Sequence, residues 1–148
     1  MQLNIRVAQD KDISALVEFN QNMAFETEQK RLDSEVLSKG VGALVADSNK
    51  GFYLVAELDA QVVGSLMVTT EWSDWRNAVF WWIQSVYIVP NFRRRGIYAQ
   101  LYAKVKALAE EQGNICGFRL YVEKDNTVAQ STYTALGMHE SHYLMFEE

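Results

Sequence analysis

Arg93-Arg94-Arg95-Gly96-Ile97-Tyr98 is the stretch where an apolar, strand-like run that ends at Val89-Pro90 gives way to a helix-like run. A strand that turns through a glycine into a helix leaves several backbone N–H groups unpaired at the helix start. With the positive end of the helix dipole, these groups form an anion site, and three arginines add forked cationic donors that suit phosphate. The stretch therefore predicts a phosphate or other anion site. The alternative is a basic turn that holds no ligand.

The composition indicates one globular domain over residues 1–148, with 49% hydrophobic residues. Cys116 is the only cysteine, so no intrachain disulfide can form, which suits a reducing, cytoplasmic compartment. The N-terminus lacks the apolar core of a signal peptide. The longest apolar run, residues 79–83, is too short to span a bilayer, so we expect no membrane partner.

The net charge of −5 and the isoelectric point of about 5.1 argue against nucleic acid as a partner. An acidic protein is compatible with a cationic substrate that is steered by carboxylates, although ordinary surface acidity explains the charge equally well. The two histidines, His139 and His142, are too few for a metal site, so we expect no metal.

Hydrophobic periodicity predicts the order of the helices and strands. Strands are expected at residues 4–7, 52–58, 61–70, 78–89 and 118–122, with short closing strands at 138–140 and 142–146. Helices are expected at residues 10–28, 32–46, 97–112 and 127–136, and a polar-aromatic connection at 71–77. The strand–helix–strand–helix order after Ala78 requires a parallel pair of strands, and the hairpins make the sheet mixed.

Two stretches of the chain carry recognisable motifs. The first is residues 86–97, Val-Tyr-Ile-Val-Pro-Asn-Phe-Arg-Arg-Arg-Gly-Ile, and the second is Leu120-Tyr121-Val122 with Asn126, Ala129, Tyr133 and Leu136-Gly137-Met138. The first resembles the acyl-CoA-binding motif of the GNAT superfamily of N-acetyltransferases, and the second is similar to that superfamily's second motif. The resemblance implies an α/β (α+β) fold with a central mixed, mostly antiparallel sheet. Two of its parallel strands would be splayed apart, and about four helices would flank the sheet.

The same resemblance implies acetyl-CoA as the cosubstrate. Its pantetheine arm would pair with the backbone of the first splayed strand, and its pyrophosphate would lie on amides from Arg94 to Ala99. Tyr98 stands where the family usually has Gly or Ala, so its ring must point away from the cofactor. The cofactor-binding residues implied are Val86, Tyr87, Ile88, Arg93, Arg94, Arg95, Gly96, Ile97, Tyr98, Ala99 and Asn126.

Direct acyl transfer to an amine needs a neutral amine, an oxyanion donor and a proton for the departing thiolate. Tyr133 matches the family's usual general acid; its alternative role is a core aromatic with a bonded hydroxyl. Asn126 would serve the cofactor or only cap a helix. Many relatives carry a base at the position of Trp82, and the strand 80–85 has no carboxylate. Another carboxylate acting through water, with Glu71 as the first choice, or solvent would then deprotonate the amine.

In the fold that the resemblance implies, two stretches would border the acceptor side: residues 26–28, which are acidic, and residues 71–76, which are acidic and aromatic. Tryptophans beside carboxylates suit a cationic acceptor. By strand alternation Trp82, Gln84, Val86 and Ile88 should share one face. The expected acceptor-binding residues are Glu26, Glu28, Trp75, Trp82 and Gln84. The alternative is a solvated helix end, with the tryptophans packed in a hairpin or in a homodimer surface.

The favoured function is thus an acetyl-CoA-dependent N-acetyltransferase that acts directly on a primary amine of a small cationic molecule. Acetylation of a protein N-terminus or lysine is the alternative within enzymes. A non-catalytic acyl-CoA-binding regulatory module is the alternative outside them, and the missing strand carboxylate keeps that alternative open.

Overall fold

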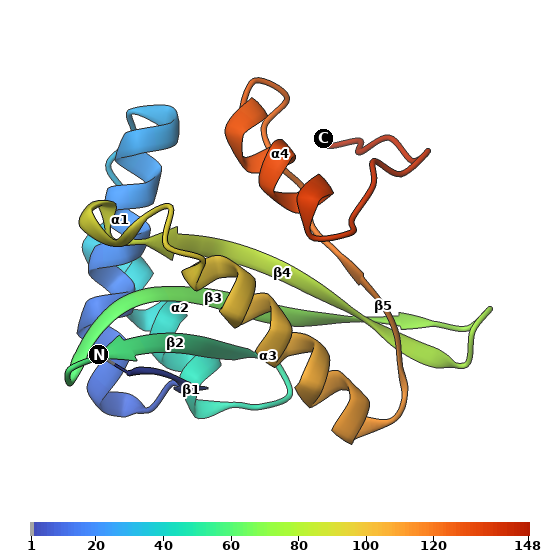
Figure 1. Ribbon diagram of the computed structural model, residues 1–148, viewed down its shortest axis with the longest axis horizontal. Helices are drawn as coiled ribbons and strands as arrows, with labels where there is room; N and C mark the ends of the chain where they lie inside the picture. Colours follow the sequence, from blue (N-terminus) through green and yellow to red (C-terminus); the bar gives the residue numbers. More distant parts are fainter. Residues whose placement is uncertain (1) are drawn as a thin grey trace.

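The computed structural model describes residues 2–148, which form a five-stranded sheet in the order β1-β2-β3-β4-β5 (Figure 1). The strands are β1 (Leu3–Val7), β2 (Phe52–Leu58), β3 (Gln61–Ser73), β4 (Ala78–Ile88) and β5 (Ile115–Arg119). The first four pair antiparallel in chain order, and β5 pairs parallel to β4. This is the mixed, mostly antiparallel sheet that the sequence predicts.

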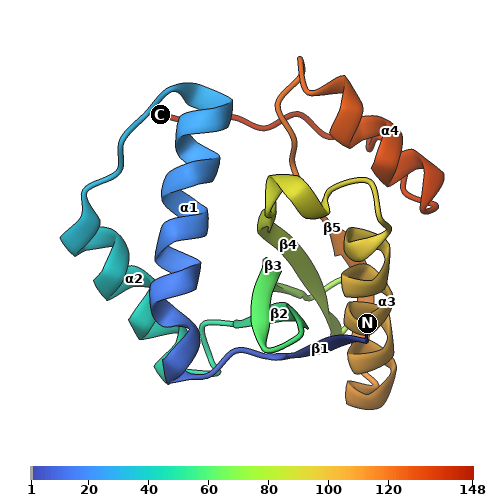
Figure 2. The same cartoon turned by 60° about the vertical axis from the view of Figure 1, so that its left-hand side comes forward.

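Residues 2–148 also form four α-helices and two short 3-10 helices. They are the 3-10 helix Asp10–Asp12, α1 (Ile13–Glu28), α2 (Ser34–Ala46), the 3-10 helix Pro90–Phe92, α3 (Ile97–Gln112) and α4 (Thr127–Ala135). Figure 2 shows α1 and α2 on one side of the sheet and α3 on the other. The four α-helices are those predicted. Most of their ends lie within two residues of the predicted ends, and the first three residues of the first predicted helix form the 3-10 helix Asp10–Asp12.

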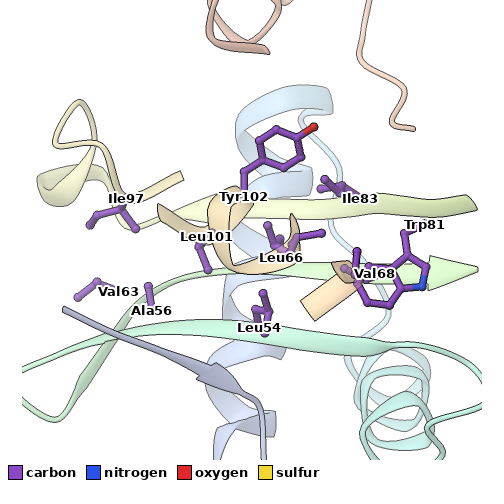
Figure 3. Packing of buried hydrophobic residues seen from close by; sticks show 12 residues of the cluster. Leu54, Ala56, Val63, Leu66, Val68, Trp81, Ile83, Ile97, Leu101 and Tyr102 are labelled. Carbon is purple, nitrogen blue, oxygen red and sulfur yellow. The ribbon is translucent and has the colours of Figure 1, made fainter. Parts of the chain in front are cut away.

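Each face of the sheet carries its own apolar cluster, because successive strand residues point to opposite sides. On the α3 face, Leu54 and Leu66 pack with Leu101 of the helix, and all three are fully buried (Figure 3). On the other face, Val55 packs with Leu16 and Val41 of α1 and α2. Apolar side chains therefore cover both sides of β2 and β3. Trp81 and Ile83 of β4, the strand on which the candidate site is built, belong to the cluster on the α3 face.

A bulge in β4 changes which side chains share a face. Ser85 has a φ of 51°, and the β3–β4 register shifts between the pairs Ser65↔Tyr87 and Met67↔Gln84. After the bulge Val86 and Ile88 pack on the α3 face. The prediction that these two share a face with Trp82 and Gln84 is therefore wrong, because one extra residue reverses the alternation.

Two predicted boundaries are also displaced. Residues 71–73 continue β3 instead of forming a connection, so the hairpin turn is confined to residues 74–77. The strand expected at 118–122 is β5, Ile115–Arg119, which therefore contains Cys116 and ends before the apolar residues 120–122. In both cases pairing with β4 decides where the strand ends.

The closing strands expected at residues 138–140 and 142–146 do not form. Residues 138–148 contain no strand, and both figures show the chain after α4 running apart from the sheet (Figures 1 and 2). None of the residues of α4, Thr127–Ala135, is buried. The C-terminal part of the chain thus has strand-like sequence without a strand partner.

Candidate active site

The two parallel strands separate halfway along β4. Their pairing runs from Val79↔Ile115 to Trp82↔Arg119. Beyond that pair, within residues 2–148, the edge of β4 from 83 to 88 that would face β5 has no strand partner, and the two strands run apart in Figure 1. Backbone N–H and C=O groups at such an edge are available to a ligand that can pair with them. This edge includes Val86, Tyr87 and Ile88, the residues expected to meet the pantetheine arm.

The loop after β4 presents the uncapped N-terminus of α3. Arg94 and Gly96 have φ values of 65° and 77°, and Gly96 occupies the N-cap position without a side-chain hydrogen bond. The amide of Gln100 donates to Gly96 O at 3.2 Å, so the amides of the first three helical residues, 97–99, precede the first helical hydrogen bond. The local geometry is that of an anion site at a helix N-terminus.

The three arginines of this loop have different surroundings. Arg93 Nε donates to Ile88 O at 2.8 Å, and its NH2 group pairs with Glu26 at 2.8 Å. Arg94 and Arg95 are exposed, and the Arg95 guanidinium lies over the Phe92 ring, 5.3 Å from its centre. Arg93 thus ties the loop to β4 and α1, while Arg94 and Arg95 remain turned to solvent.

Glu26 joins the end of α1 to this loop. Its second carboxylate oxygen accepts a hydrogen bond from the Tyr87 hydroxyl at 2.9 Å, and the Tyr87 ring is buried against Phe19. Burial, followed by the bond to Glu26, raises the pKa of Tyr87, so its hydroxyl stays a donor at neutral pH. Glu28, by contrast, is exposed and pairs with the nearby Lys30 at 3.2 Å.

A second cluster forms around Glu71, near the opposite end of β4. One oxygen of Glu71 accepts hydrogen bonds from Trp82 Nε1 at 2.8 Å and from Arg119 at 3.0 Å. The Arg119 guanidinium lies 3.7 Å from the centre of the Phe80 ring, and the Trp82 ring lies 6.2 Å from that of Tyr121. The structure therefore brings together Glu71 and Trp82, two predicted site residues, and adds Arg119.

Glu71, Phe80 and Arg119 border a pocket of about 260 Å³ at the β3–β4 hairpin. Its lining comprises Glu71, Trp72, Ser73, Asp74, Trp75, Arg76, Phe80, Arg119 and Tyr143. The lining holds two carboxylates and two guanidinium groups, so the pocket carries no excess of negative charge. Trp75 lies at the hairpin tip with 93% of its surface exposed.

The predicted acceptor residues do not form one cluster. Trp82 contacts Glu71, and Tyr87 contacts Glu26. These two contacts lie five positions apart along β4, roughly 16 Å at ~3.3 Å per residue. Gln84 lies between them, paired with Met67 of β3. Sequence reasoning missed Arg119 because its partner Glu71 is 48 positions away and only the parallel pairing of β4 with β5 joins them.

Tyr133 and Asn126 lie on α4. Asn126 accepts a hydrogen bond from the amide of Ala129 at 3.2 Å and so caps the helix. The Tyr133 ring meets the Tyr98 ring edge-on at 5.6 Å between centres. Burial raises the pKa of Tyr133, which keeps its hydroxyl protonated at neutral pH, the form that a general acid requires.

The ring of Tyr98 lies between α3 and α4. It is nearly parallel to the Tyr102 ring, with 6.2 Å between the ring centres, and it is inclined by 63° to the Tyr133 ring. Its hydroxyl is buried and has no hydrogen-bond partner among residues 2–148, and burial raises its pKa. Tyr98 and Tyr102 lie four positions apart on α3, and this spacing in the sequence already predicts that their rings lie on the same face of the helix.

The residues that the structure describes include no group of three or more His, Cys, Asp or Glu side chains that could hold a metal ion. No helix among residues 2–148 is both long enough and apolar enough to cross a membrane.

Residues 14–138 match the model of the Acetyltransferase (GNAT) family. The chain is also 31% identical over 64 residues to an aminoglycoside N(6')-acetyltransferase type 1 from Acinetobacter genomosp. 13, and this match spans 43% of each protein.

Solved structures resemble the whole chain. A possible acetyltransferase from Clostridium difficile 630 has a TM-score of 0.93 and 47% sequence identity over 100% of this chain and 97% of that one. A predicted acetyltransferase with acetyl-CoA from Clostridium acetobutylicum has a TM-score of 0.80 and 21% identity, over 99% of this chain and 96% of that one. The second likeness concerns the fold alone.

Proposed function

The chain belongs to the GNAT acetyltransferase family, and we propose that it transfers the acetyl group of acetyl-CoA directly to a primary amine of a small cationic molecule. The observation that carries this proposal is the free edge of β4 running into the uncapped N-terminus of α3. A relative whose name is aminoglycoside N(6')-acetyltransferase supports an amine as acceptor.

Acetyl-CoA would use both parts of this surface. Its pyrophosphate would accept hydrogen bonds from amides between Arg94 and Ala99, where Gly96 leaves open space in place of a side chain. Its pantetheine amides would pair with the edge of β4 from Val86 to Ile88. Arg94 and Arg95 are exposed and would add charge to the phosphate site.

In the proposed reaction, the neutral amine attacks the thioester carbonyl, a C–N bond forms, and the C–S bond breaks. Tyr133 would give its hydroxyl proton to the departing thiolate, and its raised pKa supports this protonated state. The amine proton would pass through water to Glu71. The contact of Glu71 with Trp82, the residue at the usual position of the base, supports that assignment.

The acceptor would lie along the face of β4 that carries Trp82 and Gln84. A carboxylate stands at each end of this face, and each is already paired with an arginine: Glu26 with Arg93 and Glu71 with Arg119. A cationic amine would therefore have to share these carboxylates with the guanidinium groups or displace the guanidinium groups from them. A molecule with two or more amines suits such a site, because each amine can meet one carboxylate.

The test is acetyl-CoA-dependent thiol release with a panel of polyamines and aminoglycosides, neutral amines, and peptides with a free N-terminus or lysine. We expect release with the cationic small molecules and its loss in Tyr133→Phe. Preferential release with peptides would identify a protein acetyltransferase. Calorimetric binding of acetyl-CoA without thiol release to any of these amines would instead favour the non-catalytic acyl-CoA-binding module.

A further inference from the structure

Four aromatic rings connect the core of the molecule to the proposed general acid. Tyr102 is buried in the cluster on the α3 face and meets Phe118 of β5 edge-on, with 6.0 Å between the ring centres. Tyr98 lies against Tyr102 on the same helix, and the Tyr133 ring of α4 meets Tyr98. We call Phe118, Tyr102, Tyr98 and Tyr133 the aromatic row. Because no residue of α4 is buried, this row contributes to fixing the Tyr133 ring relative to the core.

The hydroxyl of Tyr98 stands out within the aromatic row. In residues 2–148 it is the one buried side-chain nitrogen or oxygen atom that lacks a hydrogen-bond partner. An unpaired buried hydroxyl costs free energy, so native proteins hold few such groups, and a catalytic role is among the recognised reasons for one. Tyr98 also stands where the family usually has Gly or Ala, so the family's motif does not account for this hydroxyl.

The charge state of Tyr133 acts on the proton of Tyr98. Burial, followed by negative charge on Tyr133 and on Tyr102, raises the pKa of Tyr98. Tyr133 is the titratable group that faces Tyr98 from α4, and Tyr102 is the one on α3, with the Lys106 ammonium 4.7 Å from the centre of its ring. β5 contributes Phe118, which does not titrate. Tyr98 therefore stays protonated beside a phenolate at Tyr133 and can donate a hydrogen bond to it.

We propose that Tyr98 is a positioning residue, which orients the Tyr133 ring and donates a hydrogen bond to the Tyr133 oxygen once that oxygen has lost its proton. This inference rests on the proposed role of Tyr133 as general acid. In that step the Tyr133 O–H bond breaks, the departing thiolate takes the proton and becomes a thiol, and Tyr133 becomes a phenolate. Tyr98 keeps its own proton. Tyr133 then regains a proton from solvent, which receives the proton of the amine through Glu71.

Such a hydrogen bond would offset a disadvantage of burial. Burial raises the pKa of Tyr133, which keeps the proton in place but makes its transfer to a thiolate less favourable. A donor to the phenolate stabilises the charged form and so lowers this pKa. The rings of Tyr98 and Tyr133 are already neighbours, with 5.6 Å between their centres. The proposal therefore requires rotation of the phenol side chains and no new packing of α3 against α4.

Fluorine NMR tests this effect in the protein without substrate. The chain is prepared with 3-fluorotyrosine, because the ring fluorine makes the phenol more acidic and reports its ionisation. The Tyr133 resonance is identified as the one that Tyr133→Phe lacks. We expect the Tyr133 resonance to titrate with a midpoint at higher pH in Tyr98→Phe than in the unmodified chain, because its phenolate has lost a donor.

Tyr102→Phe is the matched control for this titration. It removes a hydroxyl from the same helix, one turn from Tyr98, and should leave the Tyr133 midpoint unchanged. Circular dichroism should show the same secondary structure in all these variants, because each keeps its ring. Equal midpoints in Tyr98→Phe and the unmodified chain would overturn the proposal, whichever amine the protein acetylates.

Steady-state kinetics test whether the effect reaches the reaction. Tyr98→Phe should lower kcat roughly 10- to 100-fold, the value of one hydrogen bond to a charged group. The KM and Kd of acetyl-CoA should hardly change, because the variant keeps the backbone amide of residue 98. A rise in the Kd of acetyl-CoA with unchanged kcat would show that Tyr98 serves the cofactor and not Tyr133.

A double variant separates this inference from the proposed function. Tyr98→Phe/Tyr133→Phe should turn over as slowly as Tyr133→Phe alone, because Tyr98 acts through Tyr133. If the two losses multiply instead, Tyr98 acts independently and the proposal is wrong. A slow Tyr133→Phe beside a fully active Tyr98→Phe would refute this inference alone. A fully active Tyr133→Phe would refute the general acid of the proposed function, and this inference with it.

Discussion

The two halves of the candidate site are built in different ways. The cofactor half consists of backbone: the unpaired edge of β4 and the amides of residues 97–99 at the start of α3. The half proposed for catalysis consists of side chains from four separate elements. They are Glu71 of β3, Trp82 of β4, Arg119 at the end of β5, and Tyr133 of α4. A backbone site follows from a local motif, whereas a side-chain site depends on how distant segments pack. Substitutions should therefore act on different measurable quantities in the two halves.

The largest effect is expected from Tyr133→Phe. The change removes only the hydroxyl and retains the ring that packs against Tyr98. If Tyr133 protonates the thiolate, kcat should fall roughly ten- to ten-thousand-fold, the range for general acid catalysis, while the Kd of acetyl-CoA hardly changes. Steady-state kinetics and calorimetry measure the two values. Turnover at the rate of the unmodified protein would exclude this role.

Gly96→Asp should act on the other half. It places a carboxylate at the N-terminus of α3, where the phosphates would bind, and we expect the Kd of acetyl-CoA to rise by about 100-fold, equivalent to about 2.7 kcal/mol. Gly96→Asn is the matched control because it has the same shape, tolerates a positive φ and carries no charge. Calorimetry should show much weaker binding only for the aspartate. Equal affinities in the two variants would mean that no anion binds there.

Glu71→Gln should give a smaller effect confined to the acceptor. It keeps the shape but removes the charge that faces Arg119, so KM for a cationic amine should rise by about tenfold, the value of one hydrogen bond to a charged group. A parallel loss of kcat would indicate that Glu71 also takes the proton. Glu26→Gln is the companion variant at the other end of β4. If neither variant changes KM or kcat, the proposal of a cationic acceptor at these carboxylates is wrong.

The smallest effect is expected from Arg93→Gln. Its ion pair with Glu26 is partly exposed, with 41% and 37% of the two side chains accessible, and such pairs contribute only about 0–1 kcal/mol. The midpoint of thermal unfolding should fall by no more than about 4 °C. The affinity for acetyl-CoA should fall severalfold, less than in Gly96→Asp. If Arg93→Gln lost as much affinity for acetyl-CoA as Gly96→Asp, the main phosphate ligand would be Arg93 and not the backbone.

Sequence reasoning succeeded where the signal was local. The strand–glycine–helix transition at Gly96 and the apolar face of α3 at Ile97, Leu101 and Val105 depend on residues within a few positions of one another. The free strand edge at Val86, Tyr87 and Ile88 was implied by the family resemblance, and the structure leaves this edge of β4 without a strand partner within residues 2–148. Their roles toward acetyl-CoA remain predictions, as does the role of Tyr133.

Sequence reasoning failed where pairing with a strand that is distant in the sequence decides the face or the end of a strand. The bulge at Ser85 reverses the faces of Val86 and Ile88, and nothing in the alternating pattern reveals it. The pairing of β5 with β4 ends that strand at Arg119 instead of residue 122. The closing strands predicted for residues 138–146 have the right composition, but the structure places no strand partner beside them. Strand propensity describes what a segment can pair with, not whether a partner is present.

The sequence by itself therefore determined the order of the elements as far as α4, the family resemblance and the strand–glycine–helix turn at Gly96, because each rests on local periodicity and on turn chemistry. Only the tertiary structure decided that Glu26 meets Arg93 and Tyr87, that Glu71 meets Trp82 and Arg119, and that Tyr98 packs against Tyr133. Apart from the bond between Glu71 and Trp82, which lie 11 positions apart, these contacts join residues 35 to 67 positions apart. Such contacts form only when the sheet and its helices have packed, and no local pattern encodes them.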